Sequence, residues 1–135
     1  MKPNTQITIG EMTIRVVVSD ELIESFDATI PRAGLGPDLH YHTGMDEVFY
    51  VQSGKVAITC GDTQVVATPG MIVRVPKMTP HEWKSVDGPA RLLFSFIPGR
   101  NQAMYLAELG ELASQGASWR EGIGALREKY DNKPL

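Results

Sequence analysis

Three histidines and one glutamate form a set of side chains that could bind a metal ion. His40 and His42 lie in the segment DLHYHTGMDEVFYVQSG, Glu47 follows in the same segment, and His81 lies downstream in TPHEWKS. The chain has 3 histidines in all, so each of them belongs to this set. Three imidazoles and one carboxylate suit a divalent first-row metal, and four protein ligands leave coordination positions open for water, dioxygen or a substrate.

The spacing of these residues predicts that they converge. Residues two apart on a β-strand point to the same side, so His40 and His42 project together while Tyr41 faces the other way. The TGMD segment is typical of a loop, after which Glu47 opens the next strand. His81 begins another strand after the proline-rich turn PKMTP. If these strands close into a small barrel, the four side chains meet inside it.

Three further residues are predicted to line an apolar pocket around this site. Phe49 and Val51 share strand parity with Glu47, and Trp83 shares it with His81. We therefore expect Phe49, Val51 and Trp83 to form the substrate pocket. Trp83 could stack on an aromatic substrate, although a buried tryptophan in a barrel also serves as ordinary core.

The first part of the chain has the pattern of an all-β protein. Between residues 6 and 98, short runs rich in Val, Ile, Thr and Phe alternate with turn segments such as QSGK, CGDT and TPGM. This spacing of turns is typical of a β-sandwich or barrel. The Gly61-Asp62 pair is predicted to form a tight hairpin turn. Several strands are apolar on both faces, which favours a second covering layer and hence a homodimer.

The remaining residues have the spacing of helices. Residues 1–98 are predicted to form the β-barrel domain, and residues 99–135 a pair of α-helices packed on it within one structural domain. A lid or a partner-binding helix is the alternative role for this tail. The apolar residues of the first helix recur at helical intervals; they are Met104, Leu106, Leu109 and Leu112.

Composition excludes several classes of protein. A chain of 135 residues has the length of one domain, and 42% hydrophobic with 21% charged residues is globular composition. The formal net charge of −3 and the lack of a Lys/Arg cluster argue against nucleic-acid binding. No apolar run has membrane-spanning length. The single cysteine, Cys60, fits a reducing compartment, so we expect a cytoplasmic protein that binds a small molecule.

Two segments resemble the two conserved motifs of the cupin superfamily. The first motif, G-x5-H-x-H-x(3,4)-E-x6-G, is matched at each fixed position, and the second, G-x5-P-x-G-x2-H-x3-N, is matched in part. The matching positions are Gly34, His40, His42, Glu47 and Gly54, then Gly70, Pro76 and His81. Met78 stands where the second motif has glycine, and Ser85 where it has asparagine.

This resemblance implies a fold and a cofactor. It implies a small jelly-roll β-barrel, often dimeric, similar to small single-domain, quercetin-dioxygenase-like cupins. It also implies one divalent transition metal per chain, held by His40, His42, Glu47 and His81. Iron, nickel, manganese, copper, cobalt and zinc all accept such ligands, so the identity of the metal stays open.

Three functions fit these observations. The first is a metal-dependent dioxygenase acting on a small aromatic or enolic substrate, with Glu47 as both ligand and general base. The second is an oxygen-independent isomerase, cyclase or lyase that uses the metal as a Lewis acid. The third is a non-catalytic module that binds a small molecule. We favour the dioxygenase-type oxidoreductase, while a cupin fold alone does not decide whether the protein is an enzyme.

Overall fold

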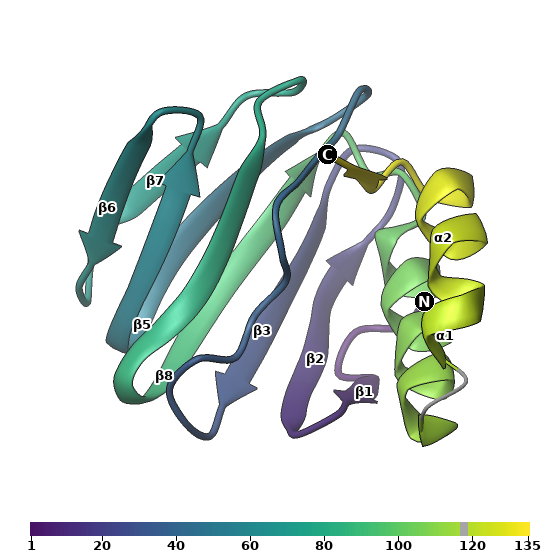
Figure 1. Cartoon of the computed structure of the whole chain (residues 1–135), viewed down its shortest axis with the longest axis horizontal. Coiled ribbons are helices and arrows are strands. Elements are labelled where there is room, and N and C mark those ends of the chain that lie inside the picture. The colour runs from purple at the N-terminus through teal and green to yellow at the C-terminus, as the bar shows by residue number, and fades with distance from the viewer. Residues whose placement is uncertain (117–118) are drawn as a thin grey trace.

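The computed structural model describes residues 1–116 and 119–135 of the chain. Figure 1 shows an antiparallel β-structure with two helices beside it. The described strands are β1 (Gln6–Ile9), β2 (Met12–Ser19), β3 (Glu24–Ile30), β4 (His40–Tyr41), β5 (Asp46–Cys60), β6 (Thr63–Ala67), β7 (Ile72–Val75), β8 (His81–Ile97) and β9 (Lys133–Pro134). The two helices are α1 (Gln102–Ser114) and α2 (Trp119–Lys129).

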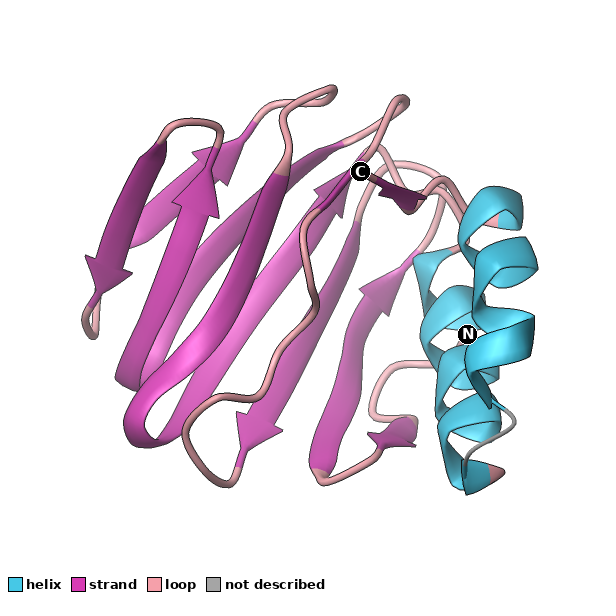
Figure 2. Cartoon of the chain, in the orientation of Figure 1, coloured by secondary structure: helices cyan, strands magenta, loops and turns pink. Residues whose placement is uncertain are grey.

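All described strands belong to one sheet in which each pair is antiparallel. The order β1-β2-β3-β8-β4-β9 forms one path, while β5 pairs with β6, β7 and β8. The two longest strands, β5 and β8, pair along most of their length and bend the sheet into two layers (Figure 2). The pairing of the described strands does not close into a ring. The predicted all-β jelly-roll class with two C-terminal helices is confirmed.

Alternating burial along the long strands places the core between the layers. On β5 and β8 buried residues alternate with more exposed ones, as expected for strands with one face inward. Phe49 lies opposite Phe94, and Val51 opposite Leu92, and all four are buried. These cross-strand apolar pairs hold the two long strands together and support the site at their ends.

The predicted turn at residues 52–55 is wrong, because β5 runs without interruption through this segment. The pairing of β5 with β8 shifts register on either side of Ser53, which is a β-bulge. Gly54 has φ +74°, and a Cβ atom there would lie 2.3 Å from the Pro89 carbonyl oxygen. The glycine therefore permits a bulge and a close backbone approach. The predicted hairpin at Gly61 is confirmed, since it joins Cys60 to its partner Thr63.

Helix α1 is attached to the sheet through a buried carboxylate. Glu24 on β3 is 1% exposed and accepts hydrogen bonds from the backbone N–H groups that open α1. The distances are 3.1 Å from Arg100, 2.7 Å from Gln102 and 2.9 Å from Ala103. A negative charge at this end complements the helix dipole, so Glu24 fixes where α1 begins. α1 packs against β1 and against α2, and the chain then returns to the sheet as β9.

Candidate metal centre

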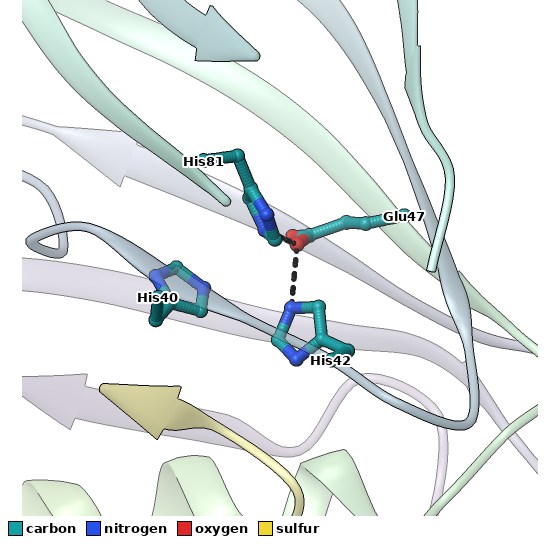
Figure 3. A group of neighbouring side chains, drawn as sticks. All are labelled: His40, His42, Glu47 and His81. Carbon is teal, nitrogen blue, oxygen red and sulfur yellow. Dashed lines mark hydrogen bonds and ion pairs between the residues drawn. The ribbon is translucent and has the colours of Figure 1, made fainter. Parts of the chain in front are cut away.

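The four residues predicted as metal ligands lie together in the fold. His40 begins β4 and is paired with His81, which begins β8, while Glu47 is on β5. His42 follows β4 directly. Figure 3 shows the four side chains turned toward one another. Their ligand atoms lie within 4.8 Å of one another, and all four residues are buried. These four side chains are called the ligand cluster below.

Each histidine of the ligand cluster is held by a backbone carbonyl. A carbonyl oxygen only accepts hydrogen bonds, so each Nδ1 carries the proton and donates it. When the ring is neutral, its Nε2 then carries a lone pair, which is the form of imidazole that binds metals; in the absence of metal, a protonated ring can instead donate from Nε2. The carbonyls are those of Asp38, 2.7 Å from His40, Asp131, 2.9 Å from His42, and Thr79, 2.9 Å from His81.

Glu47 is the negative centre of the ligand cluster. Its Oε1 lies 2.9 Å from Nε2 of His81 and 3.2 Å from Nε2 of His42. Burial raises the pKa of Glu47, but the hydrogen bonds and charges of the two imidazoles outweigh burial and lower this pKa to about 2. Burial lowers the pKa of His40 to about 4, with the charge of His81 adding to the effect. Burial also opposes protonation of His81, but its hydrogen bond to Glu47 raises its pKa overall.

The ligand cluster fits a single divalent metal ion. Because both Nδ1 atoms donate to carbonyls, the Nε2 atoms of His42 and His81 face the same carboxylate oxygen of Glu47. Lone pairs at such distances repel unless a proton or a cation lies among them. Three imidazole nitrogens and one carboxylate oxygen are a donor set for first-row transition metals. The donors, their burial and their fixed tautomers thus agree with one metal site.

A cavity of about 410 Å³ adjoins the ligand cluster. His40 and Glu47 belong to both the cluster and the cavity wall. Most of the wall is apolar, as is usual for small-molecule sites. Its apolar members include Ile14, Leu35, Phe94, Phe96, Leu106 and Leu109.

The three predicted pocket residues lie at different depths. Trp83 lines the cavity and is 5% exposed. Phe49 and Val51 are fully buried in the core and are not among the described residues that form the cavity wall. The ring of Phe49 lies 6.4 Å from the ring of His81, so it packs behind the ligand cluster.

The helical tail forms one wall of the cavity, which sequence reasoning did not predict. Tyr105 lies on α1 and Arg127 on α2, and both line the cavity. Gln102 and Asn132, also on the wall, hydrogen-bond to each other at 3.1 Å and are buried. The helical spacing showed that these helices have an apolar face, but it could not show what that face covers.

Asp131 is a further residue that sequence reasoning missed. It has φ +61°, and its carboxylate accepts hydrogen bonds from the backbone N–H groups of Thr43 and Gly44 and from the Thr43 hydroxyl, at 2.8–3.0 Å. Burial raises the pKa of Asp131, but these hydrogen bonds lower it overall. Since the Asp131 carbonyl also accepts from His42, one residue holds both the ligand and the loop after it.

The two departures from the second cupin motif have structural explanations. Met78 has φ +70°, a conformation that glycine adopts at little cost, and its N–H donates to the carbonyl of His42 at 2.6 Å. Ser85 replaces the usual asparagine, and its hydroxyl donates to the Arg32 carbonyl at 2.6 Å and accepts from the Leu35 N–H at 3.3 Å. The turn and the loop are therefore held without the residues that are usual in the motif.

Comparison with known proteins identifies the family. The sequence profile of the cupin domain matches residues 26–96, which is more than half of the chain, so this chain belongs to the cupin family. No curated protein sequence matches it. Among the described residues, neither helix is long and apolar enough to span a membrane.

Solved structures share the fold at low sequence identity. KdgF from Halomonas sp. is 17% identical with a TM-score of 0.67, and the alignment covers 73% of this chain and 90% of that one. TT1209 from Thermus thermophilus is 24% identical with a TM-score of 0.63, covering 71% and 91%. Pac13, a nucleoside dehydratase from Streptomyces, is 15% identical with a TM-score of 0.60, covering 76% and 86%. At these identities the similarity shows the fold alone.

Proposed function

We propose that this cupin is a metal-dependent enzyme of the dioxygenase type that acts on a small aromatic or enolic substrate. The observation that carries the proposal is that His40 and Glu47 belong both to the ligand cluster and to the wall of a largely apolar cavity. A molecule in the cavity therefore meets the ligand cluster directly. A divalent metal held by His40, His42, Glu47 and His81 would supply Lewis acidity and, if it is redox-active, reactivity toward dioxygen.

Glu47 is the proposed catalytic base. Its lowered pKa keeps the carboxylate ionised at neutral pH, so it can accept a proton from a substrate hydroxyl or from an acidic C–H group. The contacts of Oε1 with His42 and His81 limit its basicity, so proton transfer requires Oε1 to turn away from at least one imidazole. The backbone carbonyls that hold the histidines keep these rings in place meanwhile. The apolar wall excludes water and strengthens the polar contacts of a bound substrate.

An oxygen-independent isomerase, cyclase or lyase is the second candidate. Proton abstraction by Glu47 needs no oxidant, and Pac13, which shares the fold, is a nucleoside dehydratase that has been crystallised with uridine. A non-catalytic small-molecule-binding module is the third. The three differ in what they do with oxygen and with the bound molecule, so one set of assays separates them.

The test is oxygen consumption by protein that has been stripped with a chelator and reloaded with one metal at a time. Flavonols, catechols and β-diketones serve as substrates. We expect oxygen uptake that needs a metal and falls at least about 100-fold in His42→Ala, because a metal site that loses a ligand loses most of its function. Turnover under nitrogen would instead support the isomerase or lyase. Tight binding of these compounds without any product would support the binding module and contradict both enzymes.

We also propose that the protein is a homodimer, assembled through the outer face of β5 and its neighbours. Tyr50 is paired with Ile72 on one side and with Leu93 on the other, which makes a continuous row of outward apolar side chains. Ile72 is 68% exposed and Tyr50 39% exposed. Contiguous apolar surface of this kind is typical of protein–protein contacts.

Ile72→Lys is therefore expected to convert the dimer into a monomer, because it places a charge in the middle of this row. Sedimentation velocity measures the change in mass. Leu22→Lys is the matched control: Leu22 is 79% exposed but lies in the loop between β2 and β3, so this variant keeps the mass of the unmodified protein. A monomeric unmodified protein would contradict the proposal.

A further inference from the structure

The charged side chains on the cavity wall differ in whether they have an oppositely charged partner. Glu11 forms an ion pair with Arg32, and Asp38 forms one with Lys84 at 3.1 Å. Arg127 lines the same cavity from α2, and no ion pair among the described residues includes it. In the described part of the chain, the cavity wall thus carries one cation without a carboxylate partner.

Tyr105 places a second polar group beside this cation. It lies on α1, is 8% exposed and also lines the cavity. Burial raises the pKa of the Tyr105 hydroxyl, although the nearby Arg127 acts in the opposite direction. The phenol is therefore protonated at neutral pH. Because Tyr105 lines the cavity, its O–H group can donate to a bound molecule.

The surroundings of these two groups favour an anion over a neutral ligand. Leu106, Leu109 and Ile123 lie on the same helical wall, so the cavity beside the guanidinium is largely apolar. A cation in such surroundings is stabilised most by an anion that hydrogen-bonds to it directly. Arginine offers several N–H donors in one plane, which match the two oxygens of a carboxylate.

We propose that Arg127 and Tyr105 bind the carboxylate of the substrate at the helical wall of the cavity. The substrate class is then a small aromatic or enolic acid, whose apolar body lies along the wall and whose reacting group lies at His40 and Glu47. The inference rests on the proposed function, because it assigns the substrate class of the same cavity. It also gives the helical tail a role in specificity.

The test compares two molecules of equal shape that differ in charge. The probes are trans-cinnamate and trans-cinnamamide, and calorimetry measures their dissociation constants with the full-length, manganese-loaded protein. We expect the acid to bind at least about tenfold more tightly than the amide, because a charge-assisted hydrogen bond in an apolar cavity is strong. Arg127→Met should bring this ratio close to one, because it weakens the binding of the acid much more than that of the amide. Arg127→Lys should keep part of the preference for the acid, since lysine retains the positive charge.

Lys129→Met is the matched control for the loss of charge from α2. The side chain of Lys129 is 62% exposed, is paired with Glu108 at 3.8 Å and is not among the described residues of the cavity wall. This variant should keep the acid-to-amide ratio of the unmodified protein. Tyr105→Phe removes one oxygen atom and should lower the ratio severalfold, which provides a second test if Arg127→Met does not fold.

Repeating the titrations with chelator-stripped protein separates this inference from the proposed function. If the preference for the acid persists without metal and disappears in Arg127→Met, the inference holds even where no oxygen is consumed. If the preference disappears on stripping and is unaffected by Arg127→Met, the carboxylate binds the metal and the inference is overturned, while the proposed enzyme stands. Failure of the unmodified protein to bind either probe, or equal affinity for both, also overturns it.

Discussion

Replacing Glu47 by glutamine is expected to lower the free energy of unfolding of the metal-free protein by roughly 3 kcal/mol at pH 6. The carboxylate is buried, and the hydrogen bonds of His42 and His81 lower its pKa from 4.5 to about 2. Each unit of difference between the folded and unfolded pKa corresponds to about 1.4 kcal/mol of stability. Glutamine keeps the shape of the side chain but loses the charge that the two imidazoles stabilise.

The effect has a defined pH dependence. Because the folded pKa of Glu47 is lower than the unfolded one, its stabilising contribution is complete above pH 4.5 and is lost as the pH falls toward 2. The difference between the unmodified protein and Glu47→Gln should therefore be largest at pH 6 and smaller at about pH 3. Urea unfolding in the presence of a chelator measures the free energy of unfolding of the two proteins at each pH.

Glu21→Gln is the control for the loss of a carboxylate. Glu21 is exposed in the loop between β2 and β3, so its substitution should change the stability little at either pH. Equal stabilities of the unmodified protein and Glu47→Gln at pH 6 would show that Glu47 is not stabilised by the imidazoles in the metal-free state.

Asp131→Ala is expected to weaken metal binding by about ten- to hundred-fold without removing any ligand. The substitution removes the hydrogen bonds from Thr43 and Gly44 that hold the loop after His42. It also places alanine at φ +61°, which is unfavourable, and so displaces the carbonyl that fixes Nδ1 of His42. Competition with a chromophoric chelator gives the dissociation constant of the metal.

Two variants define the specificity of this effect. Asp131→Asn keeps one side-chain oxygen and tolerates positive φ, so it should bind metal more tightly than Asp131→Ala. Asp20→Ala removes a carboxylate that caps a turn elsewhere, where it accepts from the N–H groups of Leu22 and Ile23 at 2.8 and 3.0 Å. It should leave metal affinity unchanged. If Asp131→Ala binds metal as tightly as the unmodified protein, the tail does not position His42.

The sequence was enough to predict that the four residues of the ligand cluster lie together, because this prediction needs only the spacing of residues along a strand and the chemistry of their side chains. The side-chain period of a strand places His40 and His42 on one side, and three histidines with one carboxylate narrow the chemistry to metal binding. The same reasoning could not tell whether an inward-facing residue lines the cavity or lies deeper in the core. Phe49 and Val51 share the inward face with Glu47, yet they lie in the core, because parity tells which face a residue occupies and not how far along the strand from the site it lies.

Contacts between distant parts of the chain were beyond the reach of local patterns. The hydrogen bond from Nδ1 of His42 to the Asp131 carbonyl joins residues that are 89 apart in sequence. The residues around either one do not identify the other as its partner. The segment QSGK has turn residues, but the stability of two long paired strands makes it a bulge instead. Local propensity was overruled there by the pairing of β5 with β8.

The long separation between His42 and Asp131 bears on how the protein matures. During synthesis, all four side chains of the ligand cluster leave the ribosome well before residue 131 does. In a growing chain the His42 ring thus lacks the carbonyl that fixes its tautomer, and the loop after it lacks its carboxylate anchor. Of the three histidines, His42 therefore gains the carbonyl that orients it only when the helical tail has docked. A metal ion that enters this cluster would therefore meet its fully oriented set of ligands in the folded protein and not in the nascent β-structure.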